Sequence, residues 1–224
     1  MDKLISDPNV AVIPAPWQLT GEGFILVYQF SRTFIRRSDF IAASLADHFV
    51  GGPSVVMLIN YHTSNAGPYQ ELLFIPGLFS YRRRWVSSIT RIYVSTQVSI
   101  VNGRRNWGIP KQLGDFDWRQ GEHGQEQVTV SHNGHPFAHF TLQAVGPSVP
   151  VSSRLIPADW RTLWQPGDSG PMLTRPQGAG RVRLAKCAET SLDPAYFPNL
   201  SRGQLLAALK VTRFNLTFPV AEIQ

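Results

Sequence analysis

The stretch EQVTVSHNGHPFAHFTLQAV, residues 126–145, alternates between apolar and polar residues on both sides of Asn133-Gly134. An alternation with a period of two is typical of a half-buried β-strand. Asn-Gly suits a two-residue hairpin turn, because both central residues of that turn need a positive φ. The stretch therefore predicts an antiparallel hairpin with Asn133 and Gly134 at its tip.

Runs rich in Val, Ile, Thr and aromatic residues flank this hairpin and are typical of strands. We expect them at residues 23–30, 54–63, 69–76, 84–101, 180–190 and 210–220. A short helix is expected at 38–49, after a Ser38 N-cap, and a helical turn or two at 202–209. Pro-rich composition indicates an extended arm over 1–20 and loops over 146–179.

The pattern predicts a mainly antiparallel β fold with small helices, an α+β arrangement built as a barrel or as packed sheets. A chain of 224 residues has enough material for a sizeable core. We expect one domain spanning residues 1–224.

The composition argues against several classes of protein. There is no long apolar run for a membrane span, no N-terminal secretory pattern, and one cysteine, Cys187, so an intrachain disulfide is excluded. The net charge of +6 is dispersed, and no nucleic-acid-binding or nucleotide motif accompanies it. We expect a cytoplasmic protein that binds neither nucleic acid nor membrane.

The segment VNGRRNWGIPKQLGDFDW, residues 101–118, draws attention to Lys111. Glycines and Pro110 fix the backbone around this lysine, which predicts a rigid loop that can aim it into a pocket. Trp107 and other apolar neighbours would desolvate the ammonium and lower its pKa. Arg104 and Arg105 are close in sequence and would act in the same direction. A neutral amine is the form that attacks a ketone to give an imine.

Lysine is rare in this chain, which has 21 basic residues. Four of them are lysines, namely Lys3, Lys111, Lys186 and Lys210. An imine-forming residue cannot be replaced by Arg, whereas most surface cations can. By composition alone, however, a lysine beside Pro and Gly is an ordinary surface residue.

The motif G-R-x-x-x-G-x-P-K-x-L-G at 103–114 resembles the lysine signature of the acetoacetate decarboxylase family. The segment TSNAGPYQE at 63–71 is similar to that family's Tyr-x-Glu strand, and it stands at a similar distance from the lysine. The resemblance covers residues 22–145. It implies a cone-like or closed β-barrel flanked by further sheet.

The resemblance implies that Lys111 is the Schiff-base lysine and that Glu71 is the neighbouring active-site glutamate. Three positions depart from the family pattern. Gly21 stands where an arginine is expected, Val56 stands near an expected carboxylate, and Gln112 replaces a second lysine. Another residue must then hold the substrate carboxylate. We assign substrate binding to Arg104, Arg91, Gln112, Tyr69 and Trp107.

The function expected from this resemblance is that of a lyase acting on a small keto acid through a lysine imine. Decarboxylation of a β-keto acid is the first expectation, and a pyruvate-dependent aldolase-dehydratase reaction is the alternative. A barrel that binds a ligand without catalysis is a third interpretation. We expect no cofactor, because the lysine itself supplies the electron sink, and we expect a homo-oligomer.

Three histidines, His132, His135 and His139, fall on the predicted hairpin. The first two lie on different strands, and the last two lack a carboxylate or cysteine at ligand spacing. We therefore interpret them as solvent-facing residues and expect no metal site.

Overall fold

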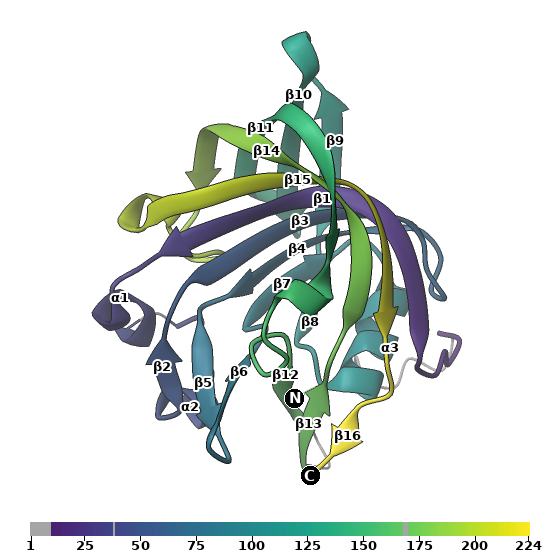
Figure 1. The fold of residues 1–224 in the computed structure, drawn as a ribbon, viewed down its shortest axis with the longest axis vertical. Coiled ribbons are helices and arrows are strands. Elements are labelled where there is room, and N and C mark those ends of the chain that lie inside the picture. Colours follow the sequence, from purple (N-terminus) through teal and green to yellow (C-terminus); the bar gives the residue numbers. More distant parts are fainter. Residues whose placement is uncertain (1–9, 38, 168–169) are drawn as a thin grey trace.

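The computed structural model describes residues 10–37, 39–167 and 170–224, and two β-sheets dominate it (Figure 1). In the described part of the chain, the larger sheet has ten strands. In spatial order they are β8 (Lys111–Leu113), β7 (Arg91–Val94), β4 (Tyr69–Ile75), β3 (Ser54–Thr63), β1 (Trp17–Gln29), β15 (Gln204–Phe218), β14 (Gln177–Leu192), β11 (His135–Ser152), β10 (Gln125–His132) and β9 (Asp115–Gln120).

This larger sheet is strongly curved (Figure 1). Its neighbouring strands are antiparallel except for β7 and β8, which are parallel. The edge strands β8 and β9 follow each other in the chain and are separated only by Gly114. The sheet is therefore barrel-like and nearly closed.

The smaller sheet lies beside this barrel. Its strands are, in spatial order, β16 (Glu222–Ile223), β13 (Gly170–Thr174), β12 (Leu163–Gly167), β6 (Arg84–Ser87), β5 (Leu78–Tyr81) and β2 (Phe49–Gly51). A mainly antiparallel fold with a barrel and a flanking sheet is thus confirmed.

The helices are short. They are α1 (Arg32–Arg37), α2 (Ala43–Ala46) and α3 (Gln97–Trp107), with 3-10 turns η1 (Glu122–Gly124), η2 (Ser153–Leu155) and η3 (Leu200–Arg202). Within the described ranges, no helix is long and apolar enough to cross a membrane.

Strand β3 of the larger sheet is covered on both faces over most of its length, and this explains its continuous apolar run. On β3, Val56 and Leu58 belong to one buried cluster, whereas Met57 and Ile59 face the other side and pack against a second cluster. Because both faces are buried, apolar residues follow one another along the strand, and the usual alternation of apolar and polar residues is absent. The second cluster is the one that surrounds the site described below.

Several sequence predictions hold. The strands predicted at 54–63 and 69–76 correspond to β3 and β4. The chain reverses direction in the predicted hairpin at Asn133 and Gly134. These residues have φ values of 51° and 77°, and an Asn-Gly turn requires positive φ at both positions.

Other predictions are wrong. The β-prone segment 84–101 contains β6 and β7 but ends in α3, because Thr96 caps a helix whose Val and Ile residues are held by tertiary packing. Residues 146–179, predicted as loops, contain the end of β11 together with β12 and β13. The helical turn predicted at 202–209 is mostly strand β15. The helix predicted at 38–49 is confirmed only over the four residues of α2, and its proposed N-cap Ser38 lies outside the described residues. Helix α1, which precedes that range, was not predicted.

Gly23 on β1 allows a close approach to β3. A Cβ added there would lie 2.3 Å from the Leu58 carbonyl oxygen and 3.0 Å from Ile59 Cα. Both are backbone atoms of a paired strand, so they cannot move away cheaply. We expect Gly23→Ala to lower the free energy of unfolding by about 1–3 kcal/mol, as measured by urea denaturation.

Gly121→Ala is the matched control, because the nearest atom to a Cβ at that position is 3.5 Å away. A Gly23→Ala protein as stable as the Gly121→Ala protein would contradict the close contact between β1 and β3.

Candidate active site

Lys111 begins β8, directly after helix α3. The helix starts at a Thr96 N-cap, whose side chain accepts a hydrogen bond from the Ser99 amide, and it ends at Gly108 with a left-handed φ of 65°. Pro110 then leads into the strand, and Lys111 pairs with Ile92 of β7. The prediction of a loop position was therefore wrong: the lysine sits on a strand, which holds it more firmly than a loop would.

The Lys111 side chain lies against one face of α3. Ser99 and Gly103 are four residues apart, so they lie on the same side of the helix. Lys111 Nζ donates a hydrogen bond of 2.9 Å to Ser99 Oγ. A Cβ on Gly103 would lie 2.7 Å from Lys111 Cδ, so only glycine leaves room for the side chain at this point.

Strands β3 and β4 supply the other polar groups around the amine. Lys111 Nζ is 3.3 Å from Glu71 Oε2 and 3.5 Å from the Tyr69 hydroxyl. Tyr61 donates a hydrogen bond of 3.2 Å to the other carboxylate oxygen, Glu71 Oε1. Both members of the ion pair are buried, with side-chain exposures of 4% for Lys111 and 5% for Glu71.

Burial lowers the pKa of the Lys111 amine, because the protonated form loses its hydration, while the Glu71 carboxylate opposes that change. Burial also raises the pKa of Tyr61 and Tyr69 well above its ordinary value, and Glu71 adds to the effect. The two tyrosines therefore stay protonated beside a carboxylate and an amine. Lys111 thus has a carboxylate and protonated hydroxyl groups within hydrogen-bonding reach of its amine.

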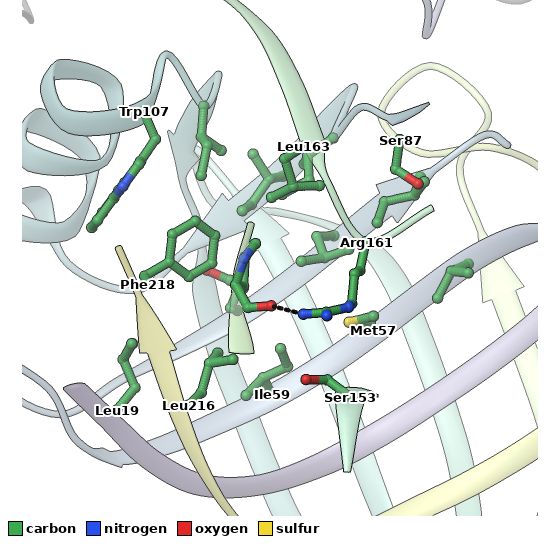
Figure 2. Close-up of a pocket in the computed structure, with 18 of the residues that line it drawn as sticks. Leu19, Met57, Ile59, Ser87, Trp107, Ser153, Arg161, Leu163, Leu216 and Phe218 are labelled. Carbon is green, nitrogen blue, oxygen red and sulfur yellow. Dashed lines mark hydrogen bonds between the residues drawn. The ribbon is translucent and has the colours of Figure 1, made fainter. Parts of the chain in front are cut away.

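The Lys111 amine faces a cavity of about 320 Å³. Its walls are mostly apolar side chains from the larger sheet, α3 and the segments around β12 (Figure 2). Trp107 forms part of the wall, and its indole packs edge-to-face against Trp17 with ring centroids 5.0 Å apart. A water-poor space with a few polar groups is typical of a small-molecule site.

Four of the residues assigned to the site from sequence line this cavity together, namely Lys111, Glu71, Tyr69 and Trp107. Gln112 does not line it, because successive side chains of a strand point to opposite faces and Lys111 takes the inner one.

The two arginines proposed to hold a substrate carboxylate lie outside the cavity. Arg104 instead donates hydrogen bonds of 3.0 and 2.7 Å to the Lys111 carbonyl oxygen, so it anchors the backbone of the lysine. Arg91 packs over the Phe40 ring at 4.9 Å. Neither Arg104 nor Arg105 is a cause of the lowered Lys111 pKa, which results from burial.

Two of the three positions that depart from the family pattern, Gly21 and Val56, lie on inner strands of the larger sheet. Gly21 is in β1, where a Cβ would lie 2.2 Å from the Asn60 carbonyl oxygen. Val56 is fully buried in the cluster on the far face of β3. Neither residue adds a charged side chain to the cavity.

Sequence reasoning missed three residues of the site. Ser99 was missed because its helix was interpreted as a strand, although Thr96 three residues before it is a recognisable N-cap. Tyr61 lies on a correctly predicted strand, but its contact with Glu71 depends on the register between β3 and β4. Arg161 lines the cavity from a segment interpreted as a loop.

The hairpin histidines are used in local contacts. His132 pairs with His135 across the hairpin, His135 Nε2 is 3.0 Å from Asp193 Oδ2, and His139 Nδ1 is 3.0 Å from Thr129 Oγ1. The described ranges contain no group of three or more His, Cys, Asp or Glu side chains that could hold a metal ion.

Comparison with known proteins gives a family match. The family model described as acetoacetate decarboxylase (ADC) matches residues 11–175, which is more than half of the chain. A search of curated protein sequences finds no match.

Solved structures share the fold over most of their length. An acetoacetate decarboxylase from Legionella pneumophila subsp. pneumophila str. Philadelphia 1 has a TM-score of 0.69 at 14% identity, covering 94% of this chain and 88% of its own. An acetoacetate decarboxylase-like enzyme from Sphingomonas wittichii RW1 has a TM-score of 0.71 at 10% identity, covering 95% and 94%.

A third structure is the enduracididine biosynthesis enzyme MppR complexed with pyruvate. Its TM-score is 0.67 at 15% identity, covering 96% of this chain and 92% of its own. The same enzyme has also been solved with the condensation product of pyruvate and imidazole 4-carboxaldehyde. At these identities, the likeness establishes the fold.

The contact between Glu71 and Lys111 predicts a change in pH dependence. Glu71→Gln removes the negative charge that favours the ammonium, so the pKa of Lys111 should fall further. We expect the pH midpoint for reductive methylation of Lys111 by formaldehyde and cyanoborohydride to move to lower pH. Peptide mass spectrometry would follow the modification.

Glu122→Gln is the control for the loss of one carboxylate, because the Glu122 side chain is 92% exposed. It should leave the midpoint where it is. An unchanged or higher midpoint in the Glu71→Gln protein would show that the carboxylate does not act on this amine.

Proposed function

Because the chain belongs to the acetoacetate decarboxylase family, we propose that it is an enzyme in which Lys111 forms an imine with a small keto acid. One observation carries the proposal: the Lys111 amine is buried at the end of an apolar cavity, in contact with Glu71, Ser99 and Tyr69. Burial favours the neutral amine that imine formation needs.

The first half of the proposed reaction joins substrate and lysine. The lone pair of neutral Lys111 Nζ attacks the carbonyl carbon, and the carbonyl oxygen becomes a hydroxyl as a proton moves from nitrogen to oxygen. A further proton, taken from solvent and delivered to that hydroxyl, lets it leave as water and gives a protonated imine. Glu71 lies 3.3 Å from Nζ, within reach to accept and return the proton in these steps.

The second half uses the imine as an electron sink. With a β-keto acid, the bond to the carboxylate breaks, carbon dioxide leaves, and its electron pair forms an enamine. A proton then adds to carbon, and water hydrolyses the imine to release a ketone and the free amine. The final hydrolysis returns the lysine to its starting form, and the imine accepts the electron pair in between, so the cycle needs no other electron acceptor.

A second reaction is favoured by two observations. Gly21, Val56 and Gln112 depart from the decarboxylase pattern, and the structural relatives include MppR, solved with pyruvate and with a pyruvate condensation product. In this alternative, the pyruvate imine loses an α-proton, and the resulting enamine adds to an aldehyde before water is eliminated. We propose decarboxylation as the first of the two reactions, because the family model that matches the chain is that of acetoacetate decarboxylase.

Borohydride trapping tests the proposal. We expect incubation with a keto acid, followed by reduction, to add the mass of the reduced substrate to Lys111. Lys111→Arg should abolish the adduct and reduce turnover about a thousandfold or more, because a guanidinium is always protonated and cannot form the imine.

Lys186→Arg is the matched control, since it makes the same exchange at an exposed lysine of β14 and should leave adduct and turnover unchanged. Circular dichroism would verify that both variants fold. No adduct with any keto acid would favour the non-catalytic binding barrel, and so would a fully active Lys111→Arg protein. Carbon dioxide release from a β-keto acid, compared with product formation from pyruvate plus an aldehyde, separates the two reactions.

A further inference from the structure

The cavity continues well beyond the amine, along β3 and β4. The Lys111 amine contacts Glu71, which pairs with Ile59, and the register continues from there through Met57 opposite Leu73 to Val55 opposite Ile75. The six paired residues all line the cavity. At about 3.3 Å per residue, four residues of strand correspond to roughly 13 Å. Pyruvate or acetoacetate would leave most of this apolar space empty.

Arg161 is the second cation in the cavity. Among the described residues that line it, the only positively charged side chains are Lys111 and Arg161. Lys111 already has Glu71 as its partner. Figure 2 shows the Arg161 side chain pointing into the cavity from the segment just before Leu163, toward the side of Met57.

The backbone around Arg161 is fixed, but its guanidinium is poorly satisfied. The Ser87 amide donates to the Thr162 carbonyl at 2.9 Å, and the Ser87 hydroxyl donates to the Trp160 carbonyl at 2.6 Å. Among the described residues, the guanidinium makes one long hydrogen bond, 3.5 Å from Nη1 to the Pro176 carbonyl oxygen, and its buried Nε has no hydrogen-bond partner there. An unpaired buried donor is costly, so this site is suited to an incoming acceptor.

We infer that Arg161 binds the carboxylate of the substrate, and that this substrate is a keto acid with an apolar chain. The planar fork of a guanidinium matches the two oxygens of a carboxylate. The apolar walls along β3 and β4 take the chain. The position of the carbonyl at Lys111 rests on the proposed function, whereas the binding of the acid at Arg161 does not.

The first measurement compares an acid and a neutral ketone of the same chain length. We expect 2-oxooctanoate to give half-maximal borohydride trapping on Lys111 at a lower concentration than either pyruvate or 2-octanone. Arg161→Met should raise that concentration about 10- to 100-fold for 2-oxooctanoate, the usual effect of losing hydrogen bonds to a charged group. For 2-octanone, Arg161→Met should change the concentration for half-maximal trapping by less than about twofold. Arg161→Lys, which keeps a charge, should fall between the wild type and Arg161→Met.

Arg154→Met is the control for the loss of one positive charge nearby. Arg154 is exposed on η2 and does not line the cavity, so its variant should behave as the wild type with all three probes. If Arg161→Met weakens trapping of the acid and the ketone equally, or weakens neither, Arg161 does not recognise the carboxylate.

The second measurement is independent of imine formation. Octanoate has no ketone, and we expect calorimetry to show that it binds the wild type at least tenfold more tightly than Arg161→Met. Octanoate binding that depends on Arg161, without any keto-acid adduct, would refute the imine chemistry and support the acid site. If a keto acid forms the adduct but Arg161→Met binds octanoate as tightly as the wild type does, the imine chemistry is supported and the acid site at Arg161 is refuted.

Discussion

The constraint on which the site depends is the removal of one lysine amine from water. An ammonium is costly to bury, and the fold offsets part of that cost with one carboxylate and two hydroxyl groups. These contacts come from α3 and β4, so they exist only when the helix and the larger sheet are assembled. Burial lowers the pKa of Lys111 while Glu71 opposes that change, and a lowered pKa is what the proposed nucleophilic role of this amine requires.

The protein has a second buried lysine, Lys210, whose amine has different surroundings from the amine of Lys111. Lys210 Nζ lies 2.5 Å from Glu126 Oε1 and 3.0 Å from Glu22 Oε2, and it also sits 4.5 Å from the Phe24 ring centroid. Two carboxylates and an aromatic ring surround this amine, whereas the Lys111 amine contacts the carboxylate of Glu71. Lys210 does not line the cavity. The two buried lysines therefore differ in the carboxylates beside them and in their access to the cavity.

The sequence predicted the elements whose signals are local and missed those that tertiary packing decides. Asn133-Gly134 specifies its own turn, and β3 and β4 are continuous apolar runs of strand length. The segment from Val98 to Val101 has the composition of a strand, yet the Thr96 cap and burial against β8 make it a helix. Arg104 looked like a ligand for the substrate, but its side chain reaches the Lys111 carbonyl because helix and strand fold back on each other at Gly108.

The same division separates the chemistry of the site from its choice of substrate. At the amine end, Lys111, Glu71 and Tyr69 come from the two motif segments that carry the family resemblance, 63–71 and 101–114, whereas Ser99 and Tyr61 lie just outside them. The rest of the cavity is closed by the smaller sheet, where β12 meets β6 through the pairing of Leu163 with Ser87. That junction places Arg161, and no motif marks it. If the proposed function holds, proteins that resemble this chain around Lys111 could share the imine chemistry and still accept different acids, because Arg161 and the wall around it come from other elements.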